Sequence, residues 1–327
     1  MTFGSIREVF DAFKNLKVLV IGDSMIDTYV YGAVNRISPE APVPVVEVHS
    51  EEHRLGGAAN VALNLQALGA EPILASIVGD DTNGALFREL MASNHLPSDY
   101  LLTLTDRPTT QKKRVLSGTK HLMRLDQECT DPISSETTSR FLDQIQSLWS
   151  VVDVVIIEDY DKGLLTPELI HRITSSAHYT RIPVCVDPKF RNFHDYKGVD
   201  LFKPNLKELE KSIASTRTEA LNVMIDQVFD LLQPRYLLLT LGSKGMIMKS
   251  TADYYRAGTK VREVADVSGA GDTVIAVASL ALAIGLTPGQ VTDLSNLAGG
   301  IVCEYSGVVP IPLSKLMKEA NELLSFN

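Results

Sequence analysis

The chain has 327 residues, of which 45% are apolar and 22% are charged, so it is long enough to bury the core of a globular protein. Its net charge of −9 argues against nucleic acid or an anionic membrane surface as the main partner, because both attract an excess of Lys and Arg. A small anionic ligand is not excluded, since it needs only a local basic pocket.

Five short apolar runs predict the strands of a buried sheet. Each run stops at a glycine or an acid, and such continuous runs are typical of strands buried on both faces of a parallel sheet. In chain order they are KVLVIGDS, ILASIVGDD, VVDVVIIEDY, IPVCVDPK and YLLLTLGSKG. The spacing of apolar residues predicts helices over residues 58–68, 83–93, 135–149, 166–176 and 218–232. This order indicates an α/β fold, with ligands beyond the carboxyl ends of the strands.

Two segments depart from this rhythm. Residues 28–50 contain alternating strands over 28–34 and 43–48, and residues 109–126 predict a hairpin that turns at Ser117-Gly118. Alternation suits a small sheet with one exposed face, so we expect these segments to form a lid over the strand ends. A plain edge extension of the main sheet is the alternative. No linker or repeat divides the chain, so we expect one domain over residues 1–327.

The cysteines and histidines argue against disulfides and zinc. Cys129, Cys185 and Cys303 are odd in number, far apart and without C-x-x-C spacing, so free thiols in a cytoplasmic protein are expected. The seven histidines are scattered and form no H-E-x-x-H motif. The N-terminus lacks an apolar signal core, and the longest nearly apolar stretch, residues 274–286, is too short to span a bilayer.

The stretch DVSGAGDTVIAVAS, residues 266–279, places small residues and an acid before a predicted helix over residues 273–284. The first backbone N–H groups of a helix have no partner within the helix, and its dipole is positive at that end. Gly269, Ala270 and Gly271 would therefore form a cup of amides suited to a phosphate. Asp272 beside this cup suits a base that removes the proton of an attacking hydroxyl in phosphoryl transfer. The alternative is an ordinary helix start capped by Ser268 or Asp272.

Together, three stretches resemble the ribokinase-like sugar kinases of the pfkB family. DVSGAGDTVIAVAS resembles the family's C-terminal signature, RLGGAANVALNLQALGA its N-terminal signature, and KPNLKELE supplies its N-x-x-E motif. Val277 departs from the general pattern, which prefers Gly or Ala there. The resemblance covers nearly the whole chain in the right order. It implies a three-layer sandwich with a central, mostly parallel sheet and a small β-sheet lid. It also implies that Asp272 is the catalytic base.

A narrower resemblance concerns the kinases of D-glycero-β-D-manno-heptose 7-phosphate. It rests on GDSMIDTYVYGAVNRISPEAPVPVV, TTQKKRVLSGTKHLMRLDQE, DYDKGLL and DVSGAGDTVI. In many bacteria this kinase domain is fused to an adenylyltransferase. The chain shows no second nucleotidyltransferase motif, so we expect the kinase alone. The implied reaction is ATP-dependent phosphorylation of the anomeric hydroxyl to the 1,7-bisphosphate, a step in making ADP-heptose for cell-envelope glycans.

The resemblance also implies the remaining site residues. Those expected to bind the sugar are Asp27, Gly56, Gly57 and Asn60. Those expected to organise ATP and Mg²⁺ are Asn205, Glu208, Gly242, Ser243, Gly245 and Asn296, with Glu208 acting on the metal through water. Asp266 and Ser268 are expected near a monovalent cation such as potassium, and Lys244 is expected to be merely exposed. Asp187 and Lys189 either face the phosphates or pair with each other.

The predicted hairpin carries a basic cluster in an acidic protein. Lys112 and Arg114 lie on one face of a strand, and Lys113 lies on the other. We expect Arg114 and Arg124, supported by Lys112, to hold the distal phosphate of the sugar, because guanidinium groups fit a phosphate with paired donors. A solvated surface is the alternative.

Three further expectations complete the sequence reading. The alternating lid strands predict a homodimer, because exposed strand edges and apolar faces favour pairing. The partners are a sugar phosphate and ATP. The rival functions are another kinase of the same family, acting on a simple sugar or a hexose phosphate, and a regulator that binds sugar phosphate without catalysis.

Overall fold

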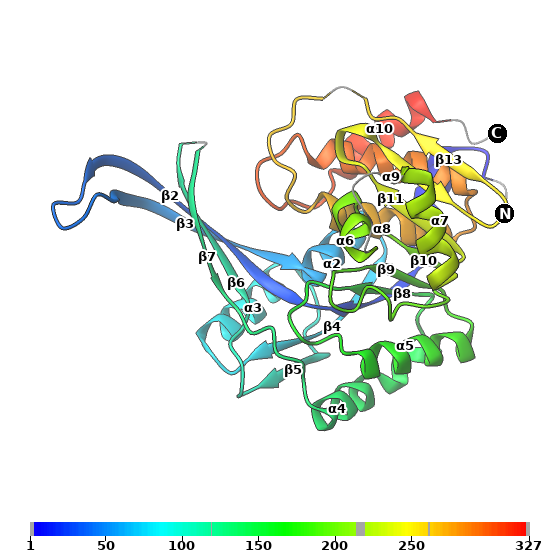
Figure 1. Ribbon diagram of the computed structural model, residues 1–327, viewed down its shortest axis with the longest axis horizontal. Coiled ribbons are helices and arrows are strands. Elements are labelled where there is room, and N and C mark those ends of the chain that lie inside the picture. The colour runs from blue at the N-terminus through cyan, green and yellow to red at the C-terminus, as the bar shows by residue number, and fades with distance from the viewer. Residues whose placement is uncertain (1–2, 119, 214–219, 261, 325–327) are drawn as a thin grey trace.

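The computed structural model describes residues 3–118, 120–213, 220–260 and 262–324. These residues form a nine-stranded sheet with helices on both faces and a separate four-stranded sheet that projects from one end of the molecule (Figure 1). The arrangement confirms the expected α/β fold with a central, mostly parallel sheet.

The large sheet contains all five strands predicted from the apolar runs. Its neighbouring strands from β11 to β5 run parallel, whereas β12 and β13 add antiparallel at one edge. Across the sheet the order is β13 (Tyr254–Ala257), β12 (Met246–Lys249), β11 (Tyr236–Thr240), β10 (Leu201–Phe202), β9 (Val184–Asp187), β8 (Val154–Glu158), β1 (Lys17–Gly22), β4 (Glu71–Gly79) and β5 (Leu101–Leu104).

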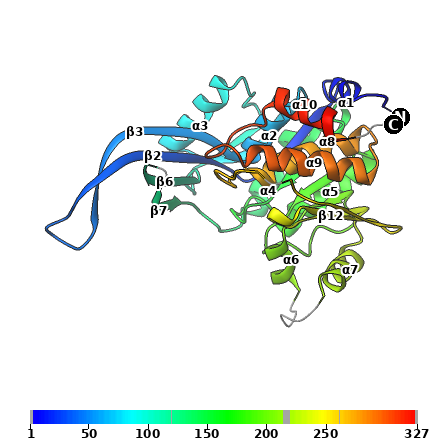
Figure 2. The same ribbon diagram turned by 90° about the horizontal axis from the view of Figure 1, so that it is seen from above.

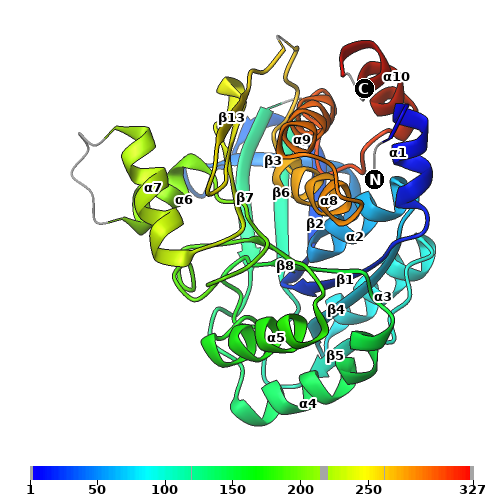
Figure 3. The same cartoon turned by 90° about the vertical axis from the view of Figure 1, so that its right-hand side faces the viewer.

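Helices cover both faces of this sheet because its strands are apolar on both sides. In β1, Val18 and Val20 belong to one buried cluster, and Leu19 and Ile21 belong to the other. Figure 3 shows the resulting three layers. The first face carries α1 (Ile6–Phe13), α2 (Ala58–Ala67), α3 (Thr82–Ser93), α8 (Ala270–Ala283), α9 (Pro288–Val302) and α10 (Leu313–Leu323). The second carries α4 (Ser135–Ile145), α5 (Pro167–Thr180), α6 (Leu206–Ser212) and α7 (Leu221–Leu232).

The predicted helices are present, and several of their limits differ from those expected. The helix expected over residues 135–149 ends at Ile145 and continues as a 3₁₀ turn, Gln146–Ser150. The expected start of α7 at Thr218 lies outside the described residues. Helix α8 begins at Ala270 instead of Thr273, so Ala270, Gly271 and Asp272 form its first turn. The reason is Gly269, whose φ of 76° turns the chain directly into the helix.

The four-stranded sheet, which we call the lid sheet, has the order β3 (Pro44–Gly57), β2 (Ser24–Ile37), β6 (Gln111–Ser117) and β7 (Lys120–Gln127). It is separate from the main sheet, so the alternative of an edge extension is wrong. Strands β2 and β3 are longer than expected, and their hairpin reaches well beyond the body of the molecule (Figure 2). Strands β6 and β7 form the predicted hairpin.

The chain passes between the two sheets almost without a connecting segment. Only Asp23 separates the end of β1 from the start of β2, and β3 continues directly into α2. Asp23 donates its N–H to the Glu158 carbonyl (3.0 Å), so the crossing point is fixed against β8. In the part of the chain that the structure describes, no helix is both long and apolar enough to cross a membrane.

Candidate active site

The candidate site lies where the carboxyl ends of the central strands meet the first turns of α2 and α8. The strand register aligns Gly22 with Glu158, and Glu158 with Asp187. The ends of β1, β8 and β9 therefore lie side by side at the edge where the sequence predicted a ligand.

Asp272 is held by two hydrogen bonds at the start of α8. Asn60 Nδ2 donates to its Oδ2, and the Tyr160 hydroxyl donates to its Oδ1, both at 2.7 Å. The side chain is only 3% exposed. Burial raises the pKa of Asp272 above its ordinary value, while the two hydrogen bonds oppose this shift by stabilising the carboxylate. The group is therefore positioned and chemically able to accept a proton.

Residues 269–271, the expected amide cup, form the cap and the start of α8. Gly269 caps the helix in a left-handed conformation, and a Cβ at this position would lie 2.9 Å from Asn60 Nδ2. A larger residue would disturb the hydrogen bond that holds Asp272. The first N–H groups of a helix have no partner four residues earlier. The Ala270 N–H donates to the Val267 carbonyl at 3.3 Å, so Gly271 is the first-turn residue whose donor best suits a phosphate.

Two further carboxylates surround the base. Glu158, Asp187 and Asp272 can each place an oxygen within 4.8 Å of the others, and all three are buried. Neither carboxylate oxygen of Glu158 has a hydrogen-bond partner among the described residues, although the side chain is fully buried. Burial, followed by the charges of Asp187 and Asp272, raises the pKa of Glu158 well above its ordinary value.

This cluster fits a divalent cation. Carboxylate oxygens are the ligands that Mg²⁺ prefers, and an unpartnered buried carboxylate gains a partner when a cation binds. A cation here would be held by Glu158 and Asp187, close to the base.

The N-x-x-E motif forms the start of α6. Asn205 and Glu208 make a capping box, in which Asn205 Oδ1 accepts from the Glu208 N–H (3.0 Å) and Glu208 Oε2 accepts from the Asn205 N–H (2.8 Å). Lys189 Nζ pairs with Glu208 Oε1 (2.8 Å), and Lys203 Nζ pairs with Asp187 (2.7 Å). The expected alternative that Asp187 and Lys189 pair with each other is wrong.

The loop between β11 and β12 contains the expected glycines. Gly242 and Gly245 have φ values of 59° and 88°, and a Cβ at Gly245 would lie 1.9 Å from the Ala257 carbonyl oxygen. Ser243 is exposed on this loop, as is Lys244, in agreement with its expected exposure. Asn296 Nδ2 donates to the Gly258 carbonyl (2.9 Å) and so fixes α9 to the segment that follows β13.

On the lid side, Asp27 lies in β2 with its carboxylate against Gly56. A Cβ at Gly56 would lie 2.1 Å from Asp27 Oδ2, so only glycine leaves room for this side chain. Arg114 from β6 forms an ion pair with Asp27, and its guanidinium lies 5.4 Å from the centroid of the Tyr29 ring. Gly57, the next residue, has a φ of 60° and caps α2, the helix that carries Asn60.

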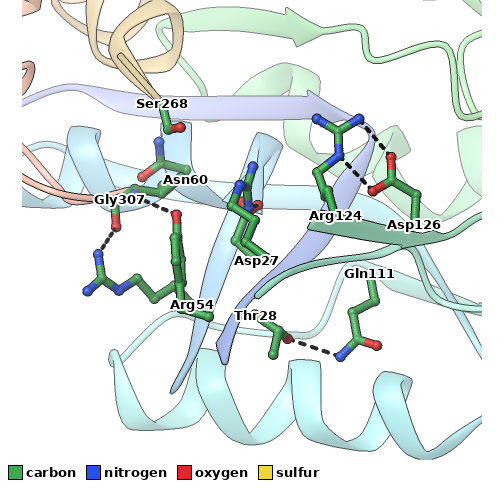
Figure 4. Close-up of polar contacts among 12 residues, drawn as sticks. Asp27, Thr28, Arg54, Asn60, Gln111, Arg124, Asp126, Ser268 and Gly307 are labelled. Atoms are coloured by element: carbon green, nitrogen blue, oxygen red, sulfur yellow. Dashed lines mark hydrogen bonds and ion pairs between the residues drawn. The ribbon is translucent and has the colours of Figure 1, made fainter. Parts of the chain in front are cut away.

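The basic residues of the lid hairpin point in three directions. Lys112 Nζ lies 5.0 Å from the centroid of the Tyr160 ring, whereas Lys113 pairs with Glu51 at 2.9 Å. The expected division of these lysines between two faces is therefore observed. Arg124 pairs with Asp126 on the exposed strand β7 (Figure 4). Arg114 and Lys112 thus lie nearest to Asp27 and Tyr160, and Arg124 is directed toward its neighbour in β7.

Asp266 and Ser268 join the segment before α8 to a later turn. Asp266 Oδ1 accepts from the N–H and hydroxyl of Ser268, and its Oδ2 accepts from the Gly307 N–H (3.0 Å). Arg54 donates to the carbonyls of Ser306 and Val308, both at 3.1 Å, from β3 of the lid sheet (Figure 4). The turn at residues 306–308 therefore contacts both the segment before α8 and the lid sheet.

Sequence reasoning missed several residues of the site. Tyr160 and Glu158 lie in the quoted run VVDVVIIEDY, and Lys203 precedes the Pro-Asn pair of the N-x-x-E motif. Arg54 opens the N-terminal signature. Their place at strand ends was a usable signal, but the partners of each come from distant parts of the chain.

Comparisons with known proteins identify similar sequences. The sequence profile described as "pfkB family carbohydrate kinase" matches residues 15–315. Curated relatives include the "Bifunctional protein HldE" of Citrifermentans bemidjiense, 36% identical over 96% of this chain and 65% of the relative, and that of Helicobacter hepaticus, 39% identical over 93% and 64%. The chain thus spans slightly less than two thirds of the length of these relatives.

Solved structures share the fold at low sequence identity. Phosphofructokinase-2 from Escherichia coli in complex with potassium has a TM-score of 0.77 at 16% identity, covering 93% of this chain and 97% of that one. Arabidopsis thaliana ribokinase complexed with ribose and ATP has a TM-score of 0.71 at 17% identity, covering 93% and 99%. These likenesses confirm the ribokinase-like fold.

Proposed function

Because the chain belongs to the pfkB family of carbohydrate kinases, we propose that it phosphorylates the anomeric hydroxyl of D-glycero-D-manno-heptose 7-phosphate with ATP. The product is the 1,7-bisphosphate, a precursor of ADP-heptose. The relatives named HldE and the sequence resemblance to heptose-phosphate kinases support this substrate.

One observation carries the proposal: a buried carboxylate lies at the amide-rich start of α8 with both oxygens hydrogen-bonded to fixed donors. Each oxygen of a carboxylate has two lone pairs, so Asp272 can still accept a proton while Asn60 and Tyr160 hold it. Such a group serves as a general base.

In the proposed reaction, Asp272 removes the proton of the anomeric hydroxyl as the oxygen attacks the γ-phosphorus of ATP. The new P–O bond forms while the bond between the γ-phosphorus and the β,γ-bridging oxygen breaks, and ADP leaves with that oxygen. Negative charge on the transferring group is stabilised by the N–H groups of residues 269–271, of which that of Ala270 is shared with the Val267 carbonyl, and by the positive end of α8.

Cations on both sides of the base complete the site. Lys189 and Lys203 lie on the nucleotide side, where their charges suit the phosphates of ATP. Mg²⁺, held by Glu158 and Asp187 with Glu208 acting through water, would neutralise phosphate charge. We place a monovalent cation beside Asp266 and Ser268. Potassium is named for the phosphofructokinase-2 structure.

Selection of a phosphorylated sugar is assigned to the lid. Arg114 is 13% exposed at its side chain and uses one nitrogen on Asp27, so donors of its guanidinium remain for a phosphate. Asp27, Gly56 and Asn60 are proposed to hold sugar hydroxyls. Lys112 and Arg124 are proposed to help neutralise the negative charge of the distal phosphate.

The test is ADP release from ATP across a panel of sugar phosphates and unphosphorylated sugars. The proposal expects strong stimulation by heptose 7-phosphate. Stimulation by a hexose phosphate or a simple sugar instead would favour the rival kinase function. Binding of sugar phosphate without ADP release would favour the non-catalytic regulator.

We also propose that the protein is a homodimer formed through the lid sheet, and that it works in the cytoplasm. Its strands and hairpins expose the apolar residues Ile37, Val43, Val48, Met123 and Leu125. A second copy would bury these side chains and pair the strand edges. The three cysteines are free thiols, which suits a reducing compartment.

A further inference from the structure

The segment from Asp159 to Gly163 carries the motif DYDKG, which follows β8 and is clamped by a buried carboxylate. Asp23 Oδ2 accepts from the N–H groups of Tyr160 (3.0 Å) and Lys162 (2.9 Å). Asp23 is 2% exposed and lies at the crossing point between the two sheets. The backbone on both sides of the Tyr160 side chain is therefore fixed to the centre of the fold.

The turn in this segment has a conformation that few residues can adopt. Asp161 has a φ of 56°, and its N–H donates to Asp159 Oδ1 at 2.8 Å. Gly163 has a φ of 88°, and a Cβ there would lie 2.0 Å from the Asp131 carbonyl oxygen. These constraints give the loop one path, and that path directs Tyr160 toward α8.

The Tyr160 side chain contacts three functional groups. Its hydroxyl donates to Asp272 Oδ1 at 2.7 Å. Its ring centroid lies 5.0 Å from the ammonium groups of Lys112 and Lys189. Lys112 belongs to the lid sheet, and Lys189 is paired with Glu208 on the nucleotide side. One aromatic ring therefore touches the base, the lid and the nucleotide side of the site.

We propose that Tyr160 is a positioning residue for phosphoryl transfer, which fixes the orientation of the Asp272 carboxylate and holds Lys112 and Lys189 against its ring. The inference rests on the proposed function. Asn60 holds one oxygen of Asp272 and Tyr160 holds the other, so rotation of the carboxylate is restricted. A base fixed in this way loses less entropy when the acceptor hydroxyl reaches it.

The hydroxyl is the donor in this hydrogen bond, because an ionised carboxylate can only accept. The ring adds a second role, because an ammonium group near an aromatic face is attracted by the ring electrons.

Tyr196 offers a matched control. Its hydroxyl donates to Asp159 Oδ2 at 2.7 Å, and its ring is fully buried, but its partner is not the base. A Tyr→Phe change at either position removes a hydroxyl that donates to a carboxylate in the same part of the fold.

The experiment compares steady-state kinetics of Tyr160→Phe, Tyr196→Phe and Asp272→Asn. Tyr160→Phe is expected to lower kcat roughly ten- to a hundred-fold, the equivalent of one lost hydrogen bond to a charged group, and to leave KM for both substrates near wild type. Tyr196→Phe is expected to keep the wild-type kcat. In the Asp272→Asn background, Tyr160→Phe is expected to have little further effect, because Tyr160 acts through Asp272.

Tyr160→Leu separates the ring from the hydroxyl. It is expected to lower kcat as Tyr160→Phe does and also to raise KM for the sugar phosphate, since Lys112 loses its ring contact. A wild-type kcat for Tyr160→Phe would overturn the proposal, as would an equal loss in the Asp272→Asn background.

A wild-type protein that releases no ADP with any sugar phosphate would refute the proposed function. The contact between Tyr160 and Asp272 would then be tested by a second measurement that does not depend on activity. Urea unfolding of the Tyr160→Phe and Asp272→Asn variants and their double variant gives the coupling between the two side chains without activity. Non-additive shifts of the unfolding midpoint are expected, and additive shifts would overturn the inference.

Discussion

Asn60 Nδ2 donates a 2.7 Å hydrogen bond to Asp272 Oδ2, although the two residues are 212 positions apart in the chain. The contact joins the N-terminal signature, at the start of α2, to the C-terminal signature, at the start of α8. Two motifs that lie far apart in the sequence thus meet in one buried contact, and the predictions below test the role proposed for it.

Asp272→Asn should lower kcat by about 10²–10⁴-fold, because an amide cannot take the proton of the acceptor hydroxyl. Binding of ATP and sugar phosphate should change little, since Asn keeps the size of the side chain. ADP release measures the rate, and calorimetry measures the two affinities. A variant that turns over at the wild-type rate would remove Asp272 from the role of base.

Arg114→Ala should raise KM for the sugar phosphate roughly ten- to a hundred-fold and leave KM for ATP nearly unchanged. The expected loss is a charge-assisted pair with the distal phosphate. Lys113→Ala is the control, because Lys113 is adjacent in β6 but pairs with Glu51 on the other face. Equal KM values in the two variants would make the hairpin a solvated surface.

Gly56→Ala should weaken binding of the sugar phosphate, because the new Cβ would lie 2.1 Å from Asp27 Oδ2 and force that carboxylate to move. Gly4→Ala is a suitable control, since its Cβ would meet only the Glu8 carboxylate at 3.7 Å. Isothermal titration with the sugar phosphate measures the effect. Unchanged affinity for the Gly56→Ala variant would show that Asp27 does not contact the sugar.

Val48→Lys should convert the proposed dimer into a monomer, because Val48 is 58% exposed on the lid sheet and a charge there opposes burial by a second copy. Val151→Lys places the same change at a residue that is 50% exposed at the end of the 3₁₀ turn, away from the lid. Light scattering at micromolar concentration distinguishes the two variants. A wild-type protein that is monomeric and fully active would exclude the dimer.

Asp159→Asn should change how stability depends on pH. Burial, followed by the charge of Asp23, raises the pKa of Asp159 to about 7 in the folded protein. An unfolded Asp titrates near pH 4, so between about pH 4 and 7 the folded state binds more protons and this group makes stability fall as pH rises. Asn carries no titrating proton, so the stability of the variant should fall less than that of the wild type as pH rises from about 4 to 7.

Thermal unfolding across that pH range measures the difference between wild type and variant. Asp195→Asn, at an exposed acid, should follow the wild-type curve. Parallel curves for wild type and Asp159→Asn would contradict the raised pKa.

The strands and most helices of the main body were predictable because they bury continuous apolar runs or one apolar face. Val154–Glu158 and Tyr236–Thr240 contain several consecutive apolar residues in short runs that stop at a glycine or an acid, a pattern typical of strands buried on both faces. The two-residue strand β10 could not be predicted, since it carries too few residues to form a pattern. The separate lid sheet was predictable from the alternation of apolar and polar residues, but its full length was not.

The candidate site was predictable where a motif carries its own geometry. Gly269 and Asp272 belong to one short motif, and the start of a helix fixes their relation. Pairings across the sheet were less accessible: Asp187 meets Lys203 from the next strand, whereas Lys189, two residues later, reaches α6. The contact of Tyr160 with Asp272 spans 112 positions and depends on the left-handed turn at Asp161, which no residue pattern predicts.

The single residue between β1 and β2 has a consequence for protein engineering. Because β1 runs into β2 through Asp23 alone, and β3 runs directly into α2, the lid is not an insertable module. Excising residues 24–57 would remove the passage between the two sheets that Asp23 fixes. It would also remove Gly57, the N-cap of α2, the helix that carries Asn60. Exchange of lids between homologous kinases to alter acceptor choice should therefore succeed only when the junctions at both sheets are transferred together.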